Sequence, residues 1–177
     1  MRSLGRDFTA PWQARAIQEA LQSLLAAELA SPSAELWLLS AWVTDLDLLD
    51  NSARAFAGLR PEWPAAGIAL SRVLADVASK GARVCVVVRD VDHNHAFIQR
   101  LRSRQISSSG RLGLAVSPNA HEKTLVGDDY VLGGSMNFTH SGTTRNDEHM
   151  LLRVDRAAAA NRRLDLNRRW GSELAWG

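Results

Sequence analysis

The chain contains few cysteines and no long apolar segment. Its single cysteine, Cys85, has no second thiol with which to form an internal disulfide, which excludes a disulfide-stabilised scaffold. No apolar run approaches the ~20 residues that a membrane-spanning helix needs. Residues 1–7 (MRSLGRD) lack the continuous apolar core of a secretory signal. We therefore expect a cytoplasmic protein that has no membrane partner.

Lysine is also rare, although cationic side chains are not. Of the 21 cationic side chains only Lys80 and Lys123 are lysines, and the rest are arginines. An arginine bias follows from a GC-rich genome, but it also suits phosphate binding, because the guanidinium offers a fork of donors to paired oxygens. The sequence pI is about 9.2. This charge pattern is compatible with a nucleic-acid partner.

The composition is that of an ordinary globular domain. Hydrophobic residues make up 46% of the 177 residues and charged residues 23%, which excludes disordered and collagen-like chains. A chain of this length has a prior of one domain. We therefore expect residues 1–177 to form a single domain.

Helical and strand patterns alternate along the chain. Helices are predicted over residues 11–30, 65–79, 96–104 and 157–170. Strands are predicted over residues 36–39, 82–88, 112–116, 122–126, 130–132 and 149–154. Scattered Asp, Asn, Gly and Pro between residues 45 and 64 indicate a long surface loop. The pattern predicts an α/β fold in which helices sandwich a mixed β-sheet.

One segment combines a histidine and a lysine with apolar neighbours. If residues 121–126 form a strand, then His121, Lys123 and Leu125 lie on one face, because side chains alternate. A lysine among apolar positions is costly unless an anion or a carboxylate meets it. One of the chain's two lysines lies here, and this favours an anion site.

Small and polar residues follow directly. The turn at 127–129 returns the chain as a paired strand, and Gly133 and Gly134 then let the backbone approach a ligand closely. Ser135 and Asn137, two residues apart, can direct a hydroxyl and an amide to the same place. Together with the histidine and lysine these groups predict a cradle for an oxyanion such as phosphate.

A carboxylate on an apolar strand face completes the set. Strand alternation places Glu148 on the face of Met150 and Leu152, where it needs a buried partner. A nucleophilic histidine needs a carboxylate on its second ring nitrogen, which fixes the tautomer and stabilises the imidazolium. We therefore predict that His121 and Glu148 form such a pair.

The order of these residues resembles the HKD signature of the phospholipase D superfamily. That signature is His-x-Lys, four residues, Asp, then Gly-Ser-x-Asn, and a downstream Asn-x-Glu commonly follows it. The motif core spans residues 120–148. Five residues rather than the usual six separate the Asp from the Gly, and Asp favours turns, so shaping the turn is the preferred role for that Asp. The matching residues are His121, Lys123, Asp128, Gly134, Ser135, Asn137, Asn146 and Glu148.

The resemblance implies a mechanism. Members with a single motif form one active site from two chains, and the sequence holds no second His-x-Lys. The implied protein is a homodimeric, metal-independent phosphodiesterase that acts through a phosphohistidine and needs no cofactor. The implied catalytic residues are His121, Lys123, Asp128, Ser135, Asn137 and Glu148, and the implied substrate-binding residues are Gly134, Thr139 and Asn146.

The arginine clusters and the small size favour a nuclease, with a nucleic-acid substrate, over a phospholipid phosphodiesterase. A non-catalytic DNA-binding subunit is a further alternative. The stretches LLSAW and PEWP resemble proteins of bacterial DNA-modification and phage-defence systems, which would add other subunits of such a system as partners. For the paired arginines of residues 162–169 two alternatives are open: they form a solvated face of the last helix, or they contact nucleic acid.

Two further features have ordinary structural alternatives. The segment 90–95 (DVDHNH) has the residue types of a metal site, but its place between a strand and a helix favours capping and the rim of the site. Trp37 and Trp42 are expected to pack in the core and at its rim rather than to stack on bases.

Overall fold

The structure is a computed structural model that describes residues 4–8, 14–106, 108–139 and 149–177. Its helices are α1 (Ala14–Ala30), α2 (Leu70–Ser79), α3 (His95–Gln105) and α5 (Arg156–Trp170), with short 3₁₀ turns at Asp92–Asn94 and Gly171–Glu173. Its strands are β1 (Leu4–Phe8), β2 (Glu35–Ser40), β3 (Asp47–Asp50), β4 (Gly67–Ala69), β5 (Arg83–Arg89), β6 (Leu112–Ser117), β7 (Thr124–Val126), β8 (Tyr130–Gly134), β9 (Met150–Val154) and β10 (Ala175–Trp176).

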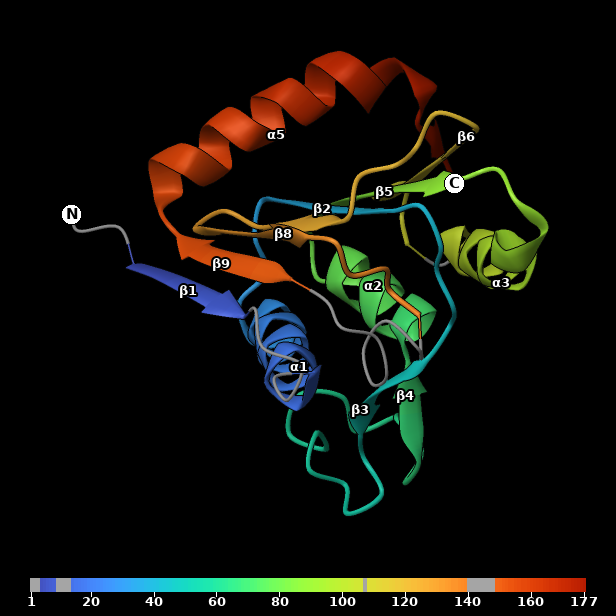
Figure 1. The fold of residues 1–177 in the computed structure, drawn as a ribbon. Helices are drawn as coiled ribbons and strands as arrows, with labels where there is room; N and C mark the ends of the chain where they lie inside the picture. The colour runs from blue at the N-terminus through green and yellow to red at the C-terminus, as the bar shows by residue number, and fades with distance from the viewer. Residues whose placement is uncertain (1–3, 9–13, 107, 140–148) are drawn as a thin grey trace.

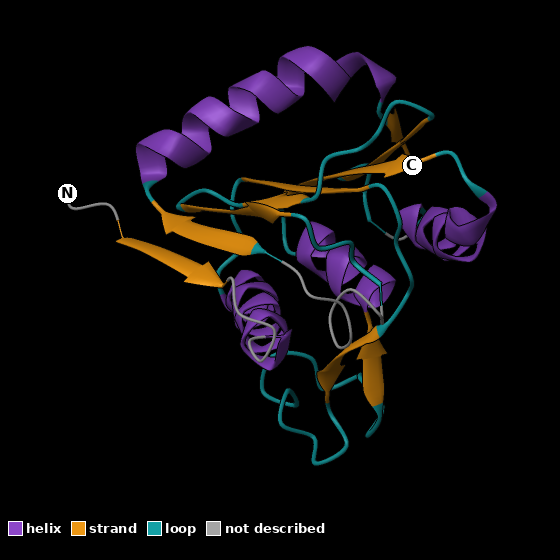
Figure 2. Ribbon diagram, in the orientation of Figure 1, coloured by secondary structure: helices purple, strands orange, loops and turns teal. Residues whose placement is uncertain are grey.

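The described strands form one eight-stranded mixed sheet and a separate small ladder. The order in the main sheet is β1-β9-β8-β7-β2-β5-β6-β10. Strands β2, β5 and β6 run parallel, and β7 pairs antiparallel with β2, so that Thr124 at the start of β7 lies opposite Leu39 near the end of β2. Strands β3 and β4 pair with each other, apart from the sheet (Figure 2).

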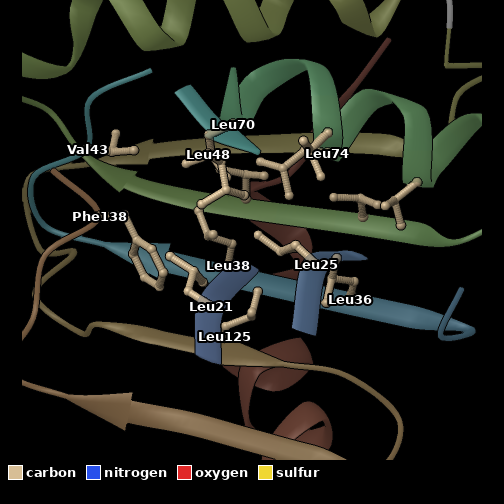
Figure 3. Packing of buried hydrophobic residues seen from close by; sticks show 14 of the residues in the cluster. Leu21, Leu25, Leu36, Leu38, Val43, Leu48, Leu70, Leu74, Leu125 and Phe138 are labelled. Atoms are coloured by element: carbon tan, nitrogen blue, oxygen red, sulfur yellow. The ribbon is translucent and has the colours of Figure 1, made fainter. Parts of the chain in front are cut away.

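Helices cover both faces of the main sheet (Figure 1). Helices α1, α2 and α3 lie on one face and α5 lies across the other. The larger core lies beneath α1 and α2, where Leu21 and Leu25 of α1 and Leu74 of α2 pack against Leu38 and Leu125 of the sheet (Figure 3). Burying such side chains contributes ~1.5–3 kcal/mol each.

A smaller core lies between α5 and the opposite face of the sheet. Trp37 and Leu39 of β2 contribute to it, together with Leu166 and Trp170 of α5. Neighbouring residues of β2 thus belong to different cores, since Leu36 and Leu38 face α1 and α2. This two-sided burial explains why β2 and β5 have almost uninterrupted apolar sequences.

The fold confirms the predicted α/β class and the mixed sheet between helices. Three local predictions were wrong. The helix predicted from residue 65 begins at Leu70, because Gly67–Ala69 is strand β4. The predicted loop 45–64 contains strand β3, and it buries Leu48 and Trp63.

The strand predicted from residue 122 begins only at Thr124. Residues 121–123 therefore lie outside the strand, and the alternation of side chains along a strand does not determine which way they point. The predicted helix 11–30 is described from Ala14 onward. No helix in the described part of the chain is both long and apolar enough to cross a bilayer.

Candidate active site

The candidate site lies at one end of the sheet, where β2, β5 and β6 finish. Since these strands are parallel, the loops that follow them emerge at the same edge. Strand β7 runs the opposite way and begins there, and β8 ends beside it, with Gly133 opposite Thr124. Ligands of open α/β sheets commonly bind outside the carboxyl ends of parallel strands.

His121 and Lys123 lie at this edge between β6 and β7. A turn joins the Ala120 amide to the Ser117 carbonyl at 3.2 Å, and buried Ala120 anchors the segment. His121 is exposed, and its imidazole makes no hydrogen bond to any described residue. The Nζ of half-buried Lys123 donates to the His121 carbonyl at 2.7 Å. The lysine forms no ion pair within the described ranges, so its charge remains available to an anion.

Asn137 is held at the same edge by the loop after β2. Its neighbours Met136 and Phe138 are fully buried, which turns the asparagine outward. Its Oδ1 accepts from the Trp42 amide at 3.2 Å. Because Trp42 N–H can only donate, this contact fixes the side-chain oxygen. Nδ2 donates to no described residue and remains a donor for a ligand.

The loop after β2 is itself attached to Phe138. Val43 bridges Phe138 in a parallel pair, and the Thr44 amide donates to the Phe138 carbonyl at 2.9 Å. The Phe138 amide donates to the Ser40 hydroxyl at 3.2 Å. Thr139, predicted to bind substrate, follows with its amide donating to the Asn137 carbonyl at 2.8 Å.

Ser135 and Gly134 connect the site to β9. The Ser135 amide donates to the His149 carbonyl at 2.8 Å, and its Oγ accepts from the His149 amide at 2.9 Å. A Cβ on Gly134 would lie 2.0 Å from the same carbonyl. The glycine is therefore required for close packing of two backbones, and the serine hydroxyl also accepts from the backbone just before β9. That Ser135 and Asn137 point at one place stays a prediction.

Asp128 lies at the opposite end of β7 from His121 and Lys123. Its Oδ2 accepts from the Ala34 amide at 2.8 Å, and its own amide donates to the Ser33 hydroxyl at 2.9 Å. Arg163 of α5 pairs with its second oxygen at 3.3 Å. These contacts hold the β7–β8 turn against the start of β2. Asp128 thus positions the strand that carries the site.

Asn146 and Glu148 lie outside the described residues. The proposed pairing of His121 with Glu148 therefore stays a prediction. The next described histidine, His149, places its Nε2 3.0 Å from Asp7 of β1.

Asn94 organises the site, and its role differs from the capping expected of segment 90–95, because its side chain makes no cap hydrogen bond to α3. It is fully buried, and its Oδ1 accepts from the Val43 amide at 2.8 Å. Its Nδ2 donates to the carbonyls of Ala41, at 2.9 Å, and Arg89, at 2.8 Å. The asparagine thus joins the ends of β2 and β5. Its position just before α3 was the available signal.

The rest of segment 90–95 has structural contacts. His93 Nε2 lies 3.2 Å from the Thr44 hydroxyl, and His95 lies 3.8 Å from Asp92. Among the described residues, no group of three or more His, Cys, Asp or Glu side chains could hold a metal ion. The segment borders the candidate site, as its place after β5 indicated.

Three arginines of α5 form contacts within the chain. Arg162 and Arg169 both bind Glu122, the residue between the histidine and the lysine, and the second contact measures 2.6 Å. Arg163 binds the Gly127 carbonyl in addition to the aspartate of the turn. Glu122 therefore faces α5. Arg168 and Arg169 stay at least half exposed, so nucleic-acid contact by this helix stays a prediction.

A hollow of about 320 Å³ adjoins the lysine. Its lining residues are Glu122, Lys123, Thr124, Val131, Gly133, Gly134 and Arg162. The site thus combines an exposed imidazole, an amide donor and an ammonium that forms no ion pair with a described residue and adjoins the hollow. This set can attack an electrophilic phosphorus and can orient and neutralise the anionic oxygens around it.

The sequence matches the family model described as "Cardiolipin synthase, PLD-like domain" over residues 59–170. No curated protein matches it significantly. NucT from Helicobacter pylori has a similar structure, with a TM-score of 0.66, 14% identity, and coverage of 99% of this chain and 100% of NucT. Nuc, a phospholipase D family member from Salmonella typhimurium, has a TM-score of 0.62, 16% identity and 99% coverage of both chains.

Phosphatidylserine synthase from Haemophilus influenzae shares the fold at a TM-score of 0.61 and 12% identity, over 99% of this chain and 40% of its own. These similarities establish the fold. The family model spans more than half of the chain and includes His121, Lys123 and Asn137. The chain therefore belongs to the phospholipase D-like domain family.

Proposed function

We propose that the protein is a metal-independent phosphodiesterase that cleaves DNA or RNA. The observation that carries the proposal is the meeting of His121, Lys123 and Asn137 at the carboxyl ends of the parallel strands. An exposed imidazole beside an unpaired ammonium and a fixed amide suits a phosphodiester, which presents one electrophilic phosphorus and two anionic oxygens.

In the proposed reaction an imidazole nitrogen of His121 attacks phosphorus and forms a P–N bond. The P–O bond to the leaving group breaks, and a second, protonated histidine gives its proton to the departing oxygen. Water then attacks the phosphohistidine, the P–N bond breaks, and the water proton passes to the second histidine. The cycle returns both imidazoles to their starting states.

The second histidine is supplied in this proposal by His121 of the partner subunit. The sequence holds one His-x-Lys, whereas the reaction needs two imidazoles in opposite protonation states. A two-fold axis through the site provides both from one gene. Stable monomers with full activity in sedimentation experiments would contradict the shared site.

Lys123 and Asn137 take the role that a divalent cation has in many phosphodiesterases. The ammonium compensates the charge that develops on the non-bridging oxygens, and Asn137 Nδ2 donates to one of them. Activity is therefore expected to persist in excess EDTA. Loss of activity on chelation, restored by added Mg²⁺, would contradict metal independence.

Nucleic acid is the substrate class that the chain favours. The sequence pI is about 9.2, and the chain covers essentially all of NucT and Nuc but 40% of the phosphatidylserine synthase. Subunits of a DNA-modification or defence system remain a prediction of the sequence. A phospholipid substrate is the alternative that the assay must separate.

The test is cleavage of end-labelled single- and double-stranded oligonucleotides by the wild type and by His121→Ala. Cleavage should be lost in this variant and retained in His95→Ala, which removes an exposed imidazole at the start of α3. Wild-type reactions quenched in denaturant at alkaline pH should contain protein-linked label that is stable to alkali and released by acid or hydroxylamine. Cleavage by His121→Ala, or label transferred from phospholipid vesicles alone, would contradict the proposal.

A further inference from the structure

Trp42 lies within cation–π distance of two cations at the rim of the candidate site. The Arg89 guanidinium carbon lies 5.7 Å from the centre of its ring, and Lys123 Nζ lies 5.9 Å from it. Both cations lie over the ring, at distances near the outer limit of cation–π contact. The residue is 38% exposed, while Trp37 and Trp63 are buried. The Trp42 side chain is therefore partly open to solvent beside the proposed phosphate ligand.

The backbone of Trp42 is fixed. Its amide donates to Asn137, and its carbonyl accepts from the Ser40 hydroxyl at 2.5 Å. The next amide, of Val43, donates to buried Asn94. The backbone that carries the indole is therefore ordered before any ligand binds, and only the side-chain torsions of Trp42 can change. A surface ordered in advance costs less entropy on binding.

Arg89 forms no ion pair with any carboxylate that the structure describes. It is half-buried at the end of β5. Arg83 at the start of the same strand provides the contrast, because it pairs with Glu35 at 3.6 Å. A half-buried guanidinium without a counter-charge favours binding of an anion, and its planar fork matches phosphate oxygens.

We propose that Trp42 and Arg89 form a nucleotide subsite next to the reacting phosphate. An unstacked base lies on the exposed indole, and Arg89 binds the phosphate adjacent to the one held by Lys123 and Asn137. The inference rests on the proposed function and adds to it that the bound strand is unpaired at this position. A paired base keeps its faces inside the duplex and is not available to the indole.

Binding is measured by fluorescence anisotropy in the His121→Ala background, so that no cleavage occurs. The probes are two labelled single-stranded oligonucleotides, one with all bases and one abasic over its central positions. Trp42→Ala should weaken binding of the first on the order of 10-fold and of the abasic strand little, because base–aromatic stacking is lost only where a base exists. Arg89→Ala should weaken binding of both probes and lower the salt slope by about 0.7.

Trp176 and Arg83 provide a matched control pair. Trp176 is 37% exposed, and Arg83 lies over its ring at 4.7 Å, yet both are away from the site, beside the start of β5. Trp176→Ala and Arg83→Ala should bind both oligonucleotides as the parent does. If Trp42→Ala weakens binding no more than Trp176→Ala, or weakens binding of both probes equally, the subsite is wrong.

These outcomes are separable from failure of the proposed function. Base-dependent binding that requires Trp42 supports the subsite even if the wild type cleaves no oligonucleotide. Conversely, cleavage lost in His121→Ala together with unchanged binding by Trp42→Ala keeps the proposed function and overturns the subsite. Binding to phosphatidylglycerol vesicles that requires Trp42, without base dependence on oligonucleotides, also overturns it.

Discussion

The side-chain oxygen of Asn137 accepts a hydrogen bond from the backbone amide of Trp42 at 3.2 Å. This contact joins the end of the Gly-Ser-x-Asn block to the loop after β2. It leaves one end of the asparagine amide, Nδ2, as the group that can meet substrate. One side chain therefore fastens the rim of the site and presents a donor into it.

Asn137→Asp tests this division of roles. The carboxylate can still accept from Trp42, so the fold should be retained, but it has lost the donor and adds a negative charge toward a phosphoryl oxygen. We expect kcat to fall on the order of 10²–10³-fold. Activity assays with circular dichroism and thermal melting as controls measure this, and full activity in Asn137→Asp would exclude a donor role.

Gly134→Ala should displace the β8–β9 ladder. The added Cβ would lie 2.0 Å from the His149 carbonyl and 2.8 Å from Met150 Sδ, and backbone cannot yield as a flexible side chain can. We expect a loss of about 1–3 kcal/mol in urea unfolding. Gly58→Ala is the control, since nothing lies within 4 Å of its new Cβ, and it should leave the midpoint unchanged. Equal midpoints for the two variants would contradict the packing argument.

Much of the fold could be predicted because it depends on local patterns. Residues 82–88 are apolar without interruption, which indicates a strand covered on both faces, and β5 occupies nearly the same range. The candidate site residues were predicted from their order along the chain and its resemblance to a family signature, and their roles stay predictions. The short spacing after Asp128 was informative too, because the structure gives this aspartate a turn-holding role.

The predictions that failed depend on distant partners. Strand β3 was missed because its sequence, Asp-Leu-Leu-Asp, resembles a loop until β4 pairs with it. Local sequence gave no sign that Arg162 and Arg169 would converge on Glu122, since that contact spans about 40 residues of chain. Asn94 likewise acquires its role only when β2 and β5 bring their ends together.

Glu122→Gln should weaken the attachment of α5. The amide keeps the shape of the side chain but loses the charge that pairs with Arg162 and Arg169. Partly exposed pairs contribute little each, so we expect a loss of roughly 0.5–1 kcal/mol, which shrinks in 1 M salt. Urea midpoints at low and high salt measure it.

The control is Asp165→Asn, which removes an exposed pair of the same helix, with Arg168 at 3.6 Å. It should leave the midpoint unchanged within error. A loss equal to that of Glu122→Gln would show that net charge on α5, not the contact with Glu122, determines the effect.

Tyr130 is the only tyrosine of the chain, so its ionisation can be observed directly. Burial, and then the negative charge of Glu28, which accepts from the phenol at 3.0 Å, raises the pKa of Tyr130 well above its ordinary value of 10.0. The unfolded chain therefore ionises first, and stability falls as the pH rises above about 10. Tyrosinate absorbance should appear near pH 10 only in denaturant.

Tyr130→Phe should cost about 1–3 kcal/mol of unfolding free energy at neutral pH, because buried Glu28 loses a donor. The variant should also lose less stability at alkaline pH than the wild type. Tyrosinate forming at pH 10 in the folded wild type would contradict the raised pKa of Tyr130.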